Sequence, residues 1–155
     1  MRDLTKFYGP LTVLVVVWSF LPLYDTVSYT TDLGSNLTYE YGTLWQMAGN
    51  GNGSVASLGL ALLAALTVLL AIATLGTSRI AIPSTIAVLG AMMMLMLLTK
   101  PATGSHPPEL TDTGAGAVAL AGCAVVVALA HVAQLAVTGQ RTSLVAVAVA
   151  EDADE

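Results

Sequence analysis

Charged residues are scarce in this chain. Asp, Glu, Lys and Arg make up 10% of its 155 residues and hydrophobic residues 55%, whereas soluble proteins carry about 25% charged residues. These proportions exclude a water-soluble enzyme, a disordered chain and a secreted disulfide scaffold. The mean hydropathy is +0.78, and the apolar residues come in long blocks. The sequence therefore indicates a small polytopic membrane protein.

Cysteine and basic residues are also scarce. The single cysteine, Cys123, cannot form an internal disulfide, and no Cys-rich metal site is available. Five Lys and Arg stand against ten Asp and Glu, for a net charge of −5, so nucleic acid is not an expected partner. Cys123 lies in an apolar run, where we expect it to pack as a small side chain.

Four apolar stretches are long enough to cross a bilayer, which takes about 20 residues. They are residues 7–24, 55–76, 80–98 and 116–138, and none contains Asp, Glu, Lys or Arg. The predicted fold is an all-α membrane protein: a four-transmembrane-helix bundle over residues 1–141. A cytoplasmic segment, 142–155, follows and ends in an acidic tail. Pro22 predicts a kink or an early helix end in the first stretch.

The basic residues predict the orientation of this bundle. One side would carry four of them: Arg2, Lys6, Arg79 and Arg141. The other side would carry only Lys100. The positive-inside rule then places both termini in the cytoplasm. The composition is typical of a bacterial protein, so we expect a multi-pass protein of the inner (plasma) membrane, with the lipid bilayer around it.

The outer loop, residues 25–54, carries the pattern of a β-hairpin. Residues 26–31 and 37–41 alternate with period two and flank a turn-rich stretch. An isolated hairpin is marginally stable, so the membrane surface, the second outer loop or another protein should support it. Trp45 would sit on one interfacial turn of helix. Tyr39, Tyr41 and Trp45 are candidate interaction residues.

Small residues predict which helices touch. Close packing of small side chains drives association between helices in lipid. Two series have a step of four residues: Ser57, Ala61 and Ala65, and then Ala115, Ala119 and Cys123. We expect the second and fourth stretches to be in close contact.

His131 is the one ionisable side chain other than Cys123 well inside a predicted span, and Gln134 continues its helical face. Polar groups in a membrane are costly and often functional. Three interpretations are open: a structural hydrogen bond within the chain or to a partner, a proton relay or quinone contact, and a haem ligand. Haem held by two histidines would need a ligand from a partner, because the other histidine, His106, lies in an outer loop.

The segment 143–150 alternates Val and Ala, with Val145 and Val147 at its centre. It is too short to span a membrane. If Gly139-Gln140-Arg141 ends the helix, the segment could be a strand that joins the sheet edge of a cytoplasmic partner. A continuing helix or a disordered segment are the alternatives.

The sequence offers little chemistry. It has no carboxylate inside a span for ion-coupled transport, no phosphate-binding loop and no zinc-ligand spacing, so we expect no catalytic residue, metal or cofactor. The predicted function is a non-catalytic accessory subunit of a larger bacterial inner-membrane complex, such as a respiratory assembly or an envelope lipid transporter. Its partners would be other integral membrane subunits and a cytoplasmic partner for 143–155. The alternative is a small homo-oligomeric channel, carrier or membrane sensor.

Overall fold

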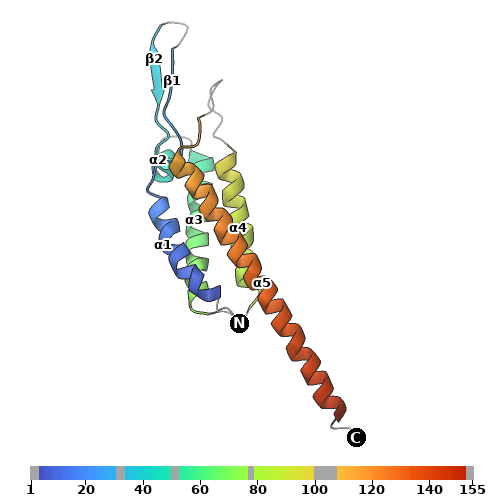
Figure 1. Cartoon of the computed structure of the whole chain (residues 1–155). Coiled ribbons are helices and arrows are strands. Elements are labelled where there is room, and N and C mark those ends of the chain that lie inside the picture. Colours follow the sequence, from blue (N-terminus) through green and yellow to red (C-terminus); the bar gives the residue numbers. More distant parts are fainter. Residues whose placement is uncertain (1–3, 31–33, 50–52, 77–78, 100–107, 153–155) are drawn as a thin grey trace.

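The computed structural model describes residues 4–30, 34–49, 53–76, 79–99 and 108–152, the last twelve of these as backbone (Figure 1). Residues 1–3, 31–33, 50–52, 77–78, 100–107 and 153–155 lie outside these ranges. They include Arg2, Lys100, His106 and part of the predicted hairpin turn. The elements are η1 (Leu4–Phe7), α1 (Tyr8–Trp18), β1 (Val27–Thr30), β2 (Asn36–Tyr39), α2 (Leu44–Gly49), α3 (Gly53–Thr74), α4 (Ala81–Leu98) and α5 (Asp112–Asp152).

Three helices of the described chain are long and apolar enough to cross a membrane: α3, α4 and α5. The first apolar helix, η1 with α1, is shorter and ends at Trp18. The prediction of one continuous span over residues 7–24 is therefore wrong in its last third, and the early helix end is the correct alternative for Pro22. The protein is mostly helical, with a small two-stranded hairpin beside the helices.

The early end of α1 has a local cause. Proline disfavours the helical conformation of the residue before it, and the chain after Pro22 becomes extended instead. Leu23 N–H donates to the carbonyl of Gly42 at 3.1 Å, and Asp25 N–H donates to that of Glu109 at 2.9 Å. The backbone groups that a longer helix would have satisfied internally are thus bonded to two other segments.

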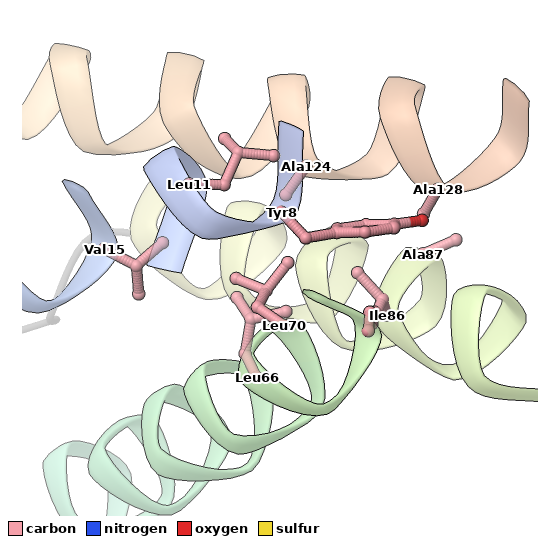
Figure 2. Packing of buried hydrophobic residues seen from close by; sticks show 10 residues of the cluster. Tyr8, Leu11, Val15, Leu66, Leu70, Ile86, Ala87, Ala124 and Ala128 are labelled. Carbon is pink, nitrogen blue, oxygen red and sulfur yellow. The ribbon is translucent and has the colours of Figure 1, made fainter. Parts of the chain in front are cut away.

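The core lies between four helices, and Tyr8 is at its centre (Figure 2). Tyr8 is fully buried, and its ring lies among the side chains of the other helices. The buried cluster is made of Tyr8, Leu11 and Val15 of α1, Leu66, Leu70 and Ala73 of α3, Ile86 and Ala87 of α4, and Ala124 and Ala128 of α5. α1 therefore packs as a full member of the bundle despite its length.

Among the described helices, α4 and α5 share the most extensive contact. Gly90 of α4 lies in this contact, against Ala121 and Val125 of α5. A methyl group on Gly90 would come within 2.9 Å of Val125 Cγ2 and 3.4 Å of the carbonyl oxygen of Ala121. Ala121, Ala124 and Ala128 form the buried face of α5. Small residues thus let the two backbones approach.

The predicted contact between the second and fourth stretches, α3 and α5, is wrong. Among the described residues, the backbone of α5 contacts α4, α1 and η1, and not α3. The reason is that α5 carries two small-residue faces, and the one with Ala121 and Ala124 fits Gly90. The residues of both predicted series are exposed: Ser57, Ala61, Ala65, Ala115, Ala119 and Cys123.

α5 continues as a helix to Asp152, so Gly139-Gln140-Arg141 does not end it. The strand alternative for 143–150 is wrong, and the continuing helix is correct. Gly139 keeps a negative φ and so does not form the left-handed C-terminal cap that would stop a helix. With 41 residues, α5 is about 60 Å long, and its C-terminal end stands clear of the other helices (Figure 1).

Candidate interaction sites

At the hairpin end of the bundle, three separate segments are joined by hydrogen bonds into what we call the outer collar: residues 18–25, 41–45 and 108–114. Tyr24 forms isolated β-bridges to Gly42 on one side and to Leu110 on the other. Thr111 N–H returns to the carbonyl of Leu23 at 3.1 Å. The base of the hairpin is therefore hydrogen-bonded to the segment that leads into α5.

Aromatic side chains tie the outer collar to the helix ends. Tyr24 Oη donates to the carbonyl of Leu97 at 2.8 Å, near the C-terminus of α4, and Trp18 Nε1 donates to the carbonyl of Thr113 at 2.7 Å. The last carbonyls of a helix have no partner within it, so Tyr24 satisfies one of them. A tyrosine hydroxyl is protonated at neutral pH, and burial raises the pKa of Tyr24 further, so it remains a donor over a wider pH range than an exposed tyrosine.

Threonines start α5 and hold it to the chain after α1. Thr111 Oγ1 accepts a hydrogen bond from Gly114 N–H at 2.9 Å and donates to the carbonyl of Pro22 at 2.8 Å. The first of these is the bond of an N-cap residue. Thr113 also donates to the carbonyl of Pro22. The capping of α5 and its attachment to the first outer segment therefore use the same residues.

Two glycines of α5 let the outer collar close. A methyl group on Gly114 would lie 2.1 Å from the carbonyl oxygen of Leu23, and one on Gly116 would lie 2.6 Å from the Trp18 ring. The contact at Gly114 is with backbone, which has little freedom to move. Only a residue without a Cβ fits there.

The hairpin has two unlike faces. Its register pairs Val27 with Tyr39, and Ser28 with Thr38. The side chains of the polar face bond each other: Ser28 and Thr38 hydroxyls are 3.2 Å apart, and Thr30 Oγ1 donates to Asn36 Oδ1 at 2.8 Å. The alternation predicted from the sequence is thus confirmed in the described strands.

The apolar face, defined by Val27, Leu37 and Tyr39, is only partly covered. Val27 packs on the cluster around Tyr24 and Tyr41. Farther from the bundle, Leu37 is 43% exposed and Tyr39 47%. Aliphatic and aromatic surface therefore stands open on a hairpin that extends beyond the ends of the helices (Figure 1).

The other two aromatic candidates of the outer loop differ from each other. Tyr41 is 5% exposed and its ring meets that of Tyr24 edge-on, so it belongs to the core of the outer collar. Trp45 lies on α2, as predicted for an interfacial turn of helix, and is 49% exposed. Its ring stacks on Phe20 with 5.9 Å between centroids, and such an amphipathic pair suits the membrane–water interface.

His131 lies at the opposite end of the bundle and is 5% exposed. The Tyr8 hydroxyl and His131 Nδ1 are hydrogen-bonded at 3.0 Å, and the two ring centroids are 5.7 Å apart. The structural hydrogen bond, one of the three interpretations of His131, is therefore present. Gln134 lies one turn farther along α5 and is half-buried, and Val145 and Val147 lie on the C-terminal part of α5.

Tyr8 is not among the predicted site residues. Its level in the membrane could have identified it as a partner of His131, because Tyr8 lies near the start of the first apolar stretch and His131 near the end of the last. Antiparallel helices bring these positions to the same level. Two polar side chains at one level in neighbouring membrane helices are expected to bond each other.

A cavity of about 40 Å³ lies between the helices in their outer half. Its walls are formed almost entirely by apolar side chains, among them Val15, Leu66 and Met93, and Trp18 and Ser19 are at its edge. The polar atoms of both edge residues are already hydrogen-bonded. The cavity therefore offers no group for acid–base or nucleophilic chemistry.

Comparison of the chain with protein-family models, with curated proteins and with solved structures finds no significant match.

Proposed function

We propose that this protein is a non-catalytic accessory subunit of a larger bacterial inner-membrane assembly, such as a respiratory complex or a lipid transporter of the cell envelope. The observation that carries this proposal is the length of α5. The helix continues through Asp152 and, at 41 residues, is about twice as long as a helix that crosses a bilayer. It runs well past Arg141, the first charged residue after the apolar stretch 116–138.

The part of α5 beyond that stretch has an apolar sequence, which another protein surface would have to bury. Its sequence contains the run Leu144 to Ala150, in which every residue is apolar. Successive residues of a helix are rotated by about 100°, so seven consecutive apolar residues leave no polar side, and such a helix is buried in stable proteins. The other helices of this chain end before the extension (Figure 1). Another chain is the natural cover.

The protein would cross the membrane four times, with both termini inside. The helix Leu4–Trp18 is about 24 Å long by the rise of its 3-10 and α turns, and a bilayer thins locally around a short span. The described basic residues are Lys6 in η1, Arg79 between α3 and α4, and Arg141 in the C-terminal part of α5. These segments lie away from the hairpin (Figure 1). Exposed Asp25, Glu40 and Glu109 lie at the hairpin end. This charge distribution is that of an outward-facing hairpin.

A non-catalytic role agrees with the surroundings of His131. The centroid of the Tyr8 ring lies 5.7 Å from that of His131, and the Tyr8 hydroxyl is hydrogen-bonded to Nδ1. A histidine that is buried and hydrogen-bonded to another helix can hold the two helices together, but little of it is accessible to a substrate. The candidate contacts with partners are instead at the two ends: Tyr39 and Trp45 outside, and Val145 and Val147 inside, with Gln134 near the inner membrane surface.

The test is gentle isolation of the full chain from its own membranes at its natural abundance. We expect a stoichiometric complex with at least one unrelated chain, and a contact that buries more than about 1,000 Å² in the structure of that complex. Replacing Val145 and Val147 by Asn should weaken it, whereas Asp154→Asn should not. Isolation of the protein as a monomer or a pure homo-oligomer would overturn the proposal and favour an independent channel, carrier or sensor.

A further inference from the structure

One face of the hairpin is apolar and the opposite face is polar. On β2, Leu37 and Tyr39 point to one face and Thr38 to the other, because side chains alternate along a strand. The polar face is satisfied within the hairpin by the Ser28–Thr38 and Thr30–Asn36 hydrogen bonds. On the other face, Leu37 and Tyr39 keep nearly half of their surface exposed, and burial of that apolar surface would be favourable.

Three carboxylates lie in the segments at the base of the hairpin, and we call them the acidic border. Asp25 precedes β1, Glu40 follows β2, and the backbone of Glu109 is bonded to that of Asp25. All three are exposed. The described residues of this end include no Lys or Arg, since Lys6 lies in η1, Arg79 between α3 and α4, and Arg141 in the C-terminal part of α5. The base of the hairpin is thus acidic.

We propose that the apolar face of the hairpin, Val27, Leu37 and Tyr39, binds a different protein through an aliphatic or aromatic patch bordered by Lys or Arg. The acidic border favours a basic partner and repels anionic headgroups. A second copy would bring the carboxylates of both copies together, which is unfavourable. The hairpin also extends along the helix axes, away from the bundle (Figure 1), so its outer half points away from a membrane around these helices.

This inference rests on the proposed function, because it assigns one contact within the assembly. It specifies which face of this protein makes the contact, on which side of the membrane the contact lies, and the chemistry of the partner's surface. The two can fail separately: a complex could form through the membrane helices or the α5 extension while the hairpin stays uncovered.

The experiment places a photo-crosslinking amino acid at Leu37 or, as the matched control, at its neighbour Thr38, in the full chain in native membranes. We expect a protein adduct from position 37 and a severalfold lower yield from position 38. The mass of the adduct should differ from twice the 15.9 kDa of this chain. Raising the salt from about 0.1 M to about 1 M, which shortens the Debye length from about 10 Å to about 3 Å, should lower the yield severalfold.

Charge variants test the acidic border. Glu40→Lys should lower the adduct yield from position 37 severalfold and Glu40→Gln by less. Thr74→Lys, at an exposed position at the end of α3 away from the hairpin, should leave the yield unchanged. Equal yields from positions 37 and 38, an adduct with a second copy or with lipid, or indifference to both salt and Glu40→Lys would overturn the inference. If a complex is isolated and the two positions still crosslink equally, the inference alone fails.

Discussion

The hydroxyl of Tyr8 and Nδ1 of His131, 123 positions apart in the chain, are hydrogen-bonded at 3.0 Å inside the bundle. This bond joins the first helix to the last. Because α1 is the shortest apolar helix of the bundle, a specific polar contact with α5 contributes to holding it in place. The position of α1 therefore depends on one pair of side chains as well as on general packing.

Removing the Tyr8 hydroxyl should destabilise the bundle measurably. Tyr8→Phe keeps the ring and leaves a buried nitrogen of His131 without this partner, which costs between about 0.5 and 2 kcal/mol. Thr12→Val is the control on the same helix, because that hydroxyl bonds only the backbone of its own helix. Unfolding in detergent by a denaturant would measure both.

A double-mutant cycle gives the pair its own test. In a His131→Leu background, Tyr8→Phe should cost little, because the partner of the hydroxyl is already gone. Strictly additive losses of stability would contradict a direct bond. His131→Leu should also change stability or assembly and no turnover. A protein that assembled normally and lost a redox or proton-transfer activity would show that His131 has a chemical role.

Gly114→Ala should be the most damaging conservative change in α5. Its methyl group would collide with the carbonyl oxygen of Leu23, and overpacking of this kind costs about 1–3 kcal/mol. Gly122→Ala is the matched control in the same helix, because nothing lies within 4 Å of the added methyl group. That variant should be neutral or gain up to about 1 kcal/mol from helix propensity. Equal stability of the two proteins would show that the outer collar is looser than described.

Thr111→Val should loosen the start of α5. The variant loses both the cap on Gly114 N–H and the bond to the carbonyl of Pro22, and the loss of a cap alone costs about 0.5–2 kcal/mol. Thr85→Val should be silent, since Thr85 is exposed and its hydroxyl bonds its own helix. Amide exchange over residues 112–118 should speed up in the first variant only. Unchanged exchange there would mean that the cap is dispensable.

The orientation can be tested with single cysteines in a Cys123→Ala background. We expect Ser35→Cys to react with an impermeant thiol reagent on intact cells. Ser143→Cys should react only after the membrane is opened. Labelling of both positions in intact cells would refute the four-span topology with both termini inside.

The parts of this fold that depend on local sequence could be predicted. The predicted spans 55–76 and 80–98 correspond to α3, Gly53–Thr74, and α4, Ala81–Leu98. The hairpin strands fall within the predicted segments to one residue. Hydropathy and side-chain alternation are properties of neighbouring residues, and such patterns suffice for these elements.

The parts that depend on partners in space could not be predicted. α5 has one small-residue face with Ala119 and Cys123 and another with Ala121 and Ala124, and nothing local to α5 distinguishes them. The choice is made by Gly90 on α4, which accepts the second face. In the same way, Pro22 predicts an early end of α1, but it does not predict that Leu23 and Asp25 then bond to the remote residues Gly42 and Glu109. The candidate contacts of Tyr39 and Trp45 with partners stay predictions.

The length of α5 has a mechanical consequence. One uninterrupted helix joins the outer collar, where Thr111 and Trp18 hold its first turn, to a C-terminal end about 60 Å away. A helix of this kind acts as a lever: a tilt of about 5° about its first turn would displace the far end by about 5 Å. Whatever shifts the collar would thereby move Glu151 and Asp152 at the far end of the helix.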